Sequence, residues 1–274
     1  MLISLAHWIA RGRYRLAGFH SSVAEHRGCA VQSVSNREED NPSLLFLHGL
    51  GTLSSSWINI LPAFRQRFRV VAPDLPGFGF STLPPATPFL SLAEHVEVLE
   101  EWVDRTFSNP FTLIGHSLGG WIAMRLAARI PTKIRKLVLI NPAGVYYEGV
   151  ESVADTLDVH STAATLRLLR AMWYRYPKYL RPFTGFVYRD LRRRSVPAFV
   201  RSLKRNDFAE GALQALRTPV ALIWGRKDRL LSSRTIDILR KEVPTASVSF
   251  IEQCGHVPQL ERPRELIRIL EKIL

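Results

Sequence analysis

Residues 115–120 read Gly-His-Ser-Leu-Gly-Gly and contain a Gly-x-Ser-x-Gly pattern. The apolar run Phe111–Ile114 precedes this stretch, and an amphipathic segment, residues 121–129, follows it. A strand, a tight glycine turn and a helix in this order are typical of a turn that presents a reactive serine at its apex. The helix directs its free N–H groups, and the positive end of its dipole, toward that turn. The stretch predicts a nucleophile at Ser117, and the alternative is a structural turn serine.

The composition is that of a soluble globular protein with one large core. The chain has 274 residues, of which 46% are hydrophobic and 22% charged, and a chain of this length can bury roughly three quarters of its unfolded surface. The two cysteines, Cys29 and Cys254, form neither a disulfide framework nor a pair at zinc-ligand spacing. We expect both to be small buried hydrophobes, compatible with a cytoplasmic location, and we expect no metal or cofactor.

The charge balance is strongly basic. The formal net charge is +13 and the isoelectric point is near 10.3, which favours an anionic partner. No nucleic-acid-binding motif accompanies the charge, so we expect no nucleic acid and favour contact with an anionic membrane surface. The alternative is a basic surface that has no charged partner.

The first forty residues are expected to form an N-terminal segment and lead-in. Residues 1–9 are mostly apolar, and Arg11, Arg13 and Arg15 follow them. A secretory signal has the opposite order, with cations first. The pattern predicts an amphipathic helix that packs against the fold or lies in a membrane interface, so peripheral membrane association is expected alongside the cytoplasmic location.

Apolar runs of strand length alternate with helical patterns along the chain. Most of the runs are continuously hydrophobic, which indicates strands covered on both faces. A capping box at Ser91–Glu94 predicts the start of one helix, and the spacing of apolar residues predicts another over Arg264–Leu274. The pattern predicts an α/β protein with a mostly parallel sheet flanked by helices. The expected strands are Ser43–His48, Phe68–Pro73, Phe111–Ile114, Lys136–Ile140, Val220–Trp224 and Ser247–Ile251.

One segment interrupts this alternation. Residues 145–215 are helical in character and rich in arginine and aromatic residues, and they lie between two core strands. Such an insertion leaves from the carboxyl ends of the strands, where sites form in parallel sheets. We expect a helical cap, or lid, over Ser117, with a core made of 41–144 and 216–274. The alternative is an insertion that only covers exposed core.

Eight histidines compete for the role of general base. A serine hydroxyl needs a base within hydrogen-bond reach, and His256 follows the last expected strand in a Cys-Gly-His-Val-Pro stretch. His48 is expected to anchor the loop after the first strand, and the side chain of His116 is expected to point away from the serine. The sequence therefore favours His256. The other five are His7, His20, His26, His95 and His160.

The carboxylate that orients the base is predicted to be Asp228. It ends a Gly-Arg-Lys-Asp stretch directly after an expected strand, and the chain order Ser117, Asp228, His256 is that of one particular fold. The main rival is Asp74, in a tightly turned loop where a carboxylate is expected to cap backbone amides. Asn141 also follows a strand, but its side chain carries no negative charge, so it is not a candidate for the orienting carboxylate.

Two backbone N–H groups are expected to stabilise the oxyanion of the reaction. One belongs to Leu118, at the beginning of the helix after the serine. The other belongs to Leu50, in the loop whose residues 48–51 read His-Gly-Leu-Gly. Trp173 and Tyr176 of the cap, together with Val257, are expected to contact the substrate.

These stretches together resemble the α/β-hydrolase family. The His-Gly loop, the Asp-Leu-Pro-Gly-Phe-Gly stretch at 74–79, the serine turn, Asp228 and Gly255-His256 occur in the family's order from about residue 43 to the C-terminus. Within the family, residues 140–144 look like the segment after the sixth strand in monoacylglycerol-lipase-type members. The resemblance implies an α/β-hydrolase fold with a helical cap, and a serine hydrolase that cleaves esters of lipophilic, acylglycerol-like substrates through an acyl-enzyme.

Other activities remain open at this point. A hydrolase of carbon–carbon bonds in vinylogous diketones would use the same three residues, with cap arginines gripping substrate carboxylates. Relatives of that kind often have Gly-Pro-Gly after the His-Gly loop, whereas this chain has Thr52-Leu53-Ser54. Perhydrolase-type members share the triad as well. A ligand receptor or inactive scaffold with a retained triad is the alternative outside enzymology.

Overall fold

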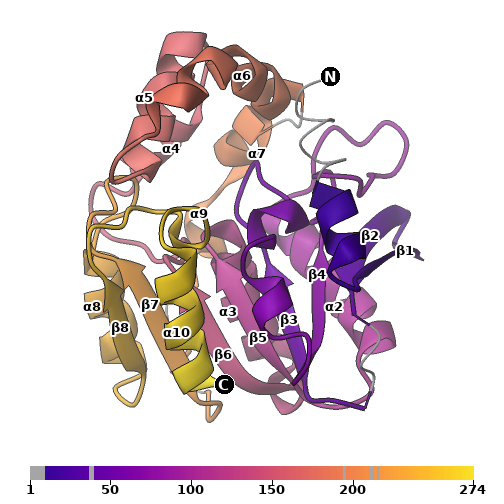
Figure 1. Cartoon of the computed structure of the whole chain (residues 1–274). Helices are drawn as coiled ribbons and strands as arrows, with labels where there is room; N and C mark the ends of the chain where they lie inside the picture. The colour runs from indigo at the N-terminus through magenta and orange to yellow at the C-terminus, as the bar shows by residue number, and fades with distance from the viewer. Residues whose placement is uncertain (1–9, 37–39, 194–195, 210, 212, 215) are drawn as a thin grey trace.

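Eight strands form one sheet in the computed structural model, which describes residues 10–36, 40–193, 196–209, 211, 213–214 and 216–274 (Figure 1). The strand order is β1-β2-β4-β3-β5-β6-β7-β8. The six strands from β4 to β8 in this order run parallel, and β2 joins them antiparallel at β4. The strands are β1 (His20–His26), β2 (Cys29–Ser35), β3 (Ser43–Leu47), β4 (Arg69–Pro73), β5 (Phe111–His116), β6 (Ile134–Ile140), β7 (Val220–Gly225) and β8 (Ser247–Ile251).

The sheet is covered on both faces. Successive side chains of a strand point to opposite faces, so Leu45 and Leu47 of β3 belong to one hydrophobic cluster, while Leu44 and Phe46 belong to the other. Helices α2, α3 and α8 pack in the first cluster, and residues 10–19 and α10 pack in the second. The central strands are therefore mostly buried, which is the origin of their continuous apolar runs.

The helices of the core follow the strands as expected from the sequence. The C-terminal helix begins one residue before its predicted start and ends one residue before its predicted end. The core helices are α2 (Leu92–Thr106), α3 (Leu118–Arg129), α8 (Arg234–Glu242), α9 (Pro258–Glu261) and α10 (Pro263–Ile273), and short 3-10 turns lie at Ser54–Trp57, Leu61–Ala63 and Pro131–Lys133.

The core begins earlier than the sequence predicted. The boundary expected at residue 41 was wrong, because β1 and β2 precede it and belong to the same sheet. The two strands form a hairpin with Arg27 and Gly28 at its tip, both at positive φ (50° and 76°), as a two-residue turn of this kind requires. Strand β1 is almost entirely exposed and polar, so it lacks the apolar run that revealed the other strands.

Between β6 and β7 the chain forms a layer of short helices above the carboxyl ends of the strands (Figure 1). We call residues 145–215 the cap. Its elements are α4 (Glu151–Leu157), α5 (Thr162–Met172), η4 (Lys178–Phe183), α6 (Thr184–Arg193), α7 (Val196–Ser202) and η5 (Arg205–Asp207).

The described part of the N-terminal segment packs on the core. Residues 10–16 are helical, and Tyr14 is buried, with its hydroxyl donating to the Ser54 carbonyl at 2.8 Å. Leu16 of the same helix is 90% exposed. The amphipathic stretch predicted over residues 1–9 lies outside the described residues.

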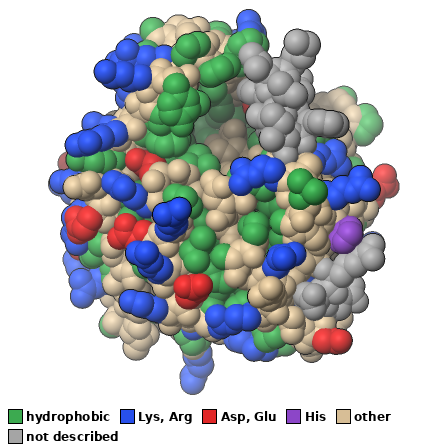
Figure 2. Space-filling view, viewed as in Figure 1, with side chains coloured by type: hydrophobic (Ala, Val, Ile, Leu, Met, Phe, Trp, Pro, Cys, Tyr) green, Lys and Arg blue, Asp and Glu red, His purple; other side chains and the backbone are tan. Residues whose placement is uncertain are grey.

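No helix in the described ranges combines the length and apolar character needed to cross a bilayer. Both cysteines are free and buried, as expected of small hydrophobes. Figure 2 shows Lys and Arg side chains spread over one face, with fewer Asp and Glu, and a recess lined by hydrophobic side chains between the cap and the core.

The capping box of α2 yields a prediction about stability. The Ser91 N–H donates to Glu94 Oε2 at 2.7 Å, and the Glu94 N–H donates to Ser91 Oγ at 3.3 Å. Replacing Ser91 with Ala removes the side-chain acceptor, so we expect a loss of about 0.5–2 kcal/mol of unfolding free energy, measured by denaturant unfolding. Ser108→Ala, at an exposed loop position, is the control. Equal stability of the two variants would show that the capping box of α2 contributes nothing to the free energy of unfolding.

Candidate active site

Ser117 lies at the sharp turn between β5 and α3. Its backbone has φ 54° and ψ −117°, and its N–H donates to the Ile140 carbonyl of β6 at 3.1 Å. Glycines permit the close packing around it, since a Cβ on Gly119 would lie 2.4 Å from the Leu47 carbonyl oxygen. A Cβ on Gly115 would lie 2.3 Å from the Gly119 carbonyl oxygen. The turn leaves Ser117 partly exposed at the carboxyl edge of the sheet.

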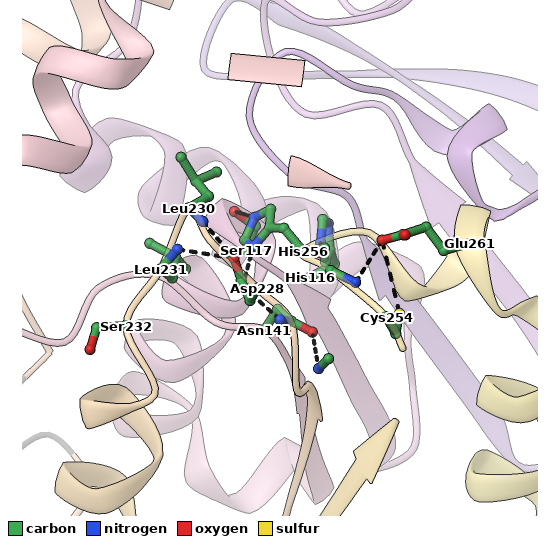
Figure 3. Close-up of polar contacts among 12 residues, drawn as sticks. His116, Ser117, Asn141, Asp228, Leu230, Leu231, Ser232, Cys254, His256 and Glu261 are labelled. Carbon is green, nitrogen blue, oxygen red and sulfur yellow. Dashed lines mark hydrogen bonds and ion pairs between the residues drawn. The ribbon is translucent and has the colours of Figure 1, made fainter. Parts of the chain in front are cut away.

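The structure brings Ser117, His256 and Asp228 together into one hydrogen-bonded chain (Figure 3). The Nδ1 of His256 lies 2.8 Å from Asp228 Oδ2, and its Nε2 lies 2.9 Å from Ser117 Oγ. Because a carboxylate only accepts hydrogen bonds, Nδ1 carries the proton. In the neutral imidazole, Nε2 is then free to accept the proton of the serine hydroxyl.

The carboxylate of Asp228 is held by three further donors. The backbone N–H groups of Leu230 and Leu231 donate to Oδ1 at 2.8 and 3.0 Å. Asn141 Nδ2 donates to Oδ2 at 2.7 Å. The side chain of Asp228 is completely buried, so these donors replace the water that a carboxylate otherwise binds.

This role of Asn141 was not predicted from the sequence, because an amide carries no charge. The side chain also accepts the Gly225 N–H at 3.1 Å through Oδ1, so it links the end of β6 to the end of β7. Its backbone lies at φ 41°, a conformation that Asn tolerates better than most residues. The feature of the sequence that could have indicated this role is the position of Asn141 directly after a parallel strand.

Among the histidines that the structure describes, His116 and His48 also lie close to the site and have structural partners. His116 Nε2 donates to the His256 carbonyl at 2.7 Å. Burial, followed by the charge of His256, lowers the pKa of His116 to about 3, so it stays neutral at physiological pH. His48 Nε2 accepts the Leu75 N–H at 2.8 Å, which ties the loop after β3 to the loop after β4.

Asp74, the rival acid, caps backbone amides. Its Oδ1 accepts the Ser54 N–H at 2.7 Å, and its Oδ2 accepts the Phe80 N–H at 2.9 Å. A Cβ on Gly79 would lie 2.0 Å from Oδ2, so the loop is wrapped closely around this carboxylate. Asp74 therefore organises the loop, and the structure gives it no contact with His256.

A cavity of about 150 Å³ lies directly over Ser117. Ser117, His256, Leu50 and Leu118 line its floor, so the two residues predicted to supply oxyanion N–H donors border the same space as the serine. The cap forms the roof with mostly aliphatic side chains, with at least one from each of its α-helices. The roof residues are Val153, Leu157, Leu168, Leu169, Met172, Val187, Leu191, Val196, Phe199, Val200 and Leu203.

The predicted substrate contacts of Trp173, Tyr176 and Val257 are not supported, because none of the three lines this cavity. Helix α5 ends at Met172, and beyond it the rings of Trp173 and Tyr176 pack edge to face on each other, with their centroids 6.3 Å apart. Val257 is buried at the start of α9. The cap aromatic residue that does line the cavity is Phe199.

Comparisons with known proteins identify the family to which the chain belongs. A sequence model of the alpha/beta hydrolase family matches residues 44–269. Monoacylglycerol lipase abhd6-B of Xenopus laevis is 25% identical over 297 residues, covering 100% of this chain and 86% of that protein. Monoacylglycerol lipase ABHD6 of Mus musculus is 26% identical over 298 residues, covering 100% and 87%.

Solved structures give the same result for the fold. The crystal structure of a membrane phospholipase A, described as a bacterial virulence factor, has a TM-score of 0.86 and 28% identity, and covers 98% of this chain and 90% of that one. A meta-cleavage product hydrolase from Pseudomonas fluorescens IP01 shares the fold, with a TM-score of 0.79 at 20% identity over 92% and 96% of the two chains. The family match extends from β3 into α10. The chain therefore belongs to the alpha/beta hydrolase family and is a hydrolase enzyme.

Proposed function

We propose that the protein is a serine hydrolase that cleaves carboxylic esters of lipophilic, acylglycerol-like substrates. The observation that carries the proposal is the hydrogen-bonded chain from Asp228 through His256 to Ser117, which ends in an apolar cavity. The monoacylglycerol lipases to which the chain is similar support the same substrate class.

Each of the predicted active-site groups has a defined part in the proposed reaction. Ser117 Oγ attacks the ester carbonyl while His256 Nε2 takes its proton. The backbone N–H groups of Leu50 and Leu118 hold the developing oxyanion. His256 then protonates the departing alcohol and afterwards activates the water that releases the acyl group from Ser117. Asp228 keeps the imidazole in the required tautomer and stabilises its protonated form.

The lining of the cavity favours an ester of a hydrocarbon acid. Among the described residues, the side chains around the cavity include no Lys or Arg. An aliphatic lining stabilises a hydrocarbon chain by removing its surface from water, at about 25 cal/mol per Å². A carbon–carbon bond hydrolase of vinylogous diketones would need cations there to bind the carboxylate of its substrate. The same triad serves a perhydrolase, so a peroxide-dependence assay distinguishes that activity.

We further propose that the cap touches an anionic membrane surface through η4. Tyr179 is 74% exposed and Phe183 40% exposed, and the neighbouring Lys178 and Arg181 are exposed as well. Aromatic rings with cationic neighbours suit the headgroup level of a bilayer. Such contact would present membrane lipids to a site beneath the same cap, as befits a chain similar to a membrane phospholipase.

Replacement of Ser117 tests the nucleophile. Ser117→Ala removes the attacking oxygen, so we expect kcat for p-nitrophenyl esters to fall about 10⁴–10⁶-fold, and covalent labelling by a fluorophosphonate probe to disappear. Ser22→Ala, on the exposed strand β1, is the matched control and should leave turnover unchanged. Near-wild-type turnover by the folded Ser117→Ala variant would refute the mechanism.

Replacement of Asp228 tests the orienting acid. In Asp228→Asn the amide oxygen is retained by the Leu230 and Leu231 N–H groups, so the NH₂ group faces His256 Nδ1 and forces the wrong tautomer. We expect kcat to fall about 10⁴-fold. Asp74→Asn should instead lower the melting temperature and affect kcat less. If Asp74→Asn were the more damaging change to kcat, the acid would be misassigned.

Vesicle binding tests the membrane proposal. We expect the protein to bind liposomes that contain anionic lipid, and to bind them more weakly as salt rises, because screening shortens the range of charge attraction. The double variant Tyr179→Ser/Phe183→Ser should bind less at every salt concentration. Equal affinity for neutral and anionic vesicles, measured by co-sedimentation, would contradict the proposal.

A further inference from the structure

The loop that carries His256 is hydrogen-bonded to the cap. The backbone N–H of His256 donates to the Met172 carbonyl at 2.6 Å. Met172 is the last residue of α5, so its carbonyl has no partner within the helix. The two segments approach so closely that a Cβ on Gly255 would lie 2.5 Å from the Met172 oxygen and 2.7 Å from the Tyr174 nitrogen.

The loop that carries Asp228 contacts the same part of the cap. The guanidinium of Arg229 donates through Nη2 to the carbonyls of Arg170 at 2.7 Å and Trp173 at 2.6 Å. The positive charge of Arg229 also interacts favourably with the negative, C-terminal end of the α5 dipole. Residues 170–175 are therefore bonded to both loops that bear the partners of Ser117.

Glu261, at the end of α9, joins the histidine loop to this cap segment. Its Oε1 accepts the Gly255 N–H at 2.8 Å, and its Oε2 accepts the Tyr174 N–H at 2.8 Å. Figure 3 shows the carboxylate directed at the histidine loop beside Cys254. Burial raises the pKa of the Glu261 carboxyl, while the N–H donors of Tyr174, Gly255 and Arg175 oppose this effect.

We propose that Glu261 is a positioning residue of the active site. Its carboxylate fastens the His256 loop to the cap segment 172–175 and so holds the imidazole 2.9 Å from Ser117 Oγ. This role rests on the proposed function, because it concerns the same catalytic histidine. It also makes the C-terminal end of α5 a fixed part of the active-site wall.

The chemistry of the link requires a carboxylate. Each oxygen of Glu261 faces a backbone donor from a different segment, and a carboxylate has acceptors on both oxygens and no hydrogen to place in the way. A glutamine of the same shape has one oxygen and one NH₂ group. It can therefore satisfy Gly255 or Tyr174, but it must set its NH₂ group against the other N–H.

Glu261→Gln in the full-length protein tests the proposal. The amount of competent enzyme is first measured by titration with a fluorophosphonate, and kcat and KM for a p-nitrophenyl ester are then expressed per titrated site. We expect kcat per site to fall about 10–100-fold, as for other small displacements of a catalytic group, while KM changes little. A purely structural role would reduce the number of sites and leave kcat per site unchanged.

Glu271→Gln is the matched control, because it removes the same charge from an exposed position on α10. It should behave as wild type. A wild-type kcat per site in Glu261→Gln would overturn the proposal. Failure of the wild-type protein to hydrolyse any ester or to react with the probe would instead refute the proposed function, so the two failures are distinguishable.

Hydrogen exchange on the unmodified protein tests the link even if the variant does not fold. The amides of Gly255, His256 and Tyr174 lie in connecting segments, yet the proposed link predicts that they exchange slowly. Exchange of all three at the rate of exposed loop amides would show that the link does not persist in solution, and the proposal would fail.

Discussion

The left-handed backbone of Ser117 is the constraint on which the rest of the site depends. A residue with a side chain pays on the order of 1–3 kcal/mol for such a conformation, so the surrounding structure must hold it. The Ser117 N–H is bonded to β6, and its carbonyl accepts the N–H groups of Trp121 and Ala143. Glycines at 115 and 119 allow strand and helix to meet closely enough for these bonds to form. The serine is thereby fixed before any substrate arrives.

The parallel sheet gathers the remaining groups around this point. Ser117 follows β5, Asn141 follows β6, Asp228 lies just beyond β7 and His256 lies just beyond β8, so four adjacent strands deliver them at one edge. Asn141 bonds both Asp228 and the N–H of Gly225, which ties the acid to the sheet. The distances between the three predicted catalytic side chains thus follow from strand pairing together with a few polar links.

The cap contributes an apolar roof and, through residues 170–175, bonds to the loops of the acid and the base. These two parts differ in chemistry. The roof consists of mostly aliphatic side chains, whereas the link at Glu261 and Arg229 is made of hydrogen bonds to backbone groups. The end of α5 is therefore the part of the cap that is hydrogen-bonded to the loops of Asp228 and His256.

The sequence by itself was enough to predict the six central strands, the capped helix α2 and a grouping of Ser117, Asp228 and His256, which the fold brings into one hydrogen-bonded chain. Continuous apolar runs report burial, and glycines and strand ends are local features. Only the tertiary structure revealed β1, which is polar and exposed, the mostly aliphatic lining of the cavity over Ser117, and the hydrogen-bond partners of Asn141 and Glu261. Each of those two side chains finds a partner 87 residues away. No local pattern encodes such pairs, because they exist only after the sheet and cap have packed.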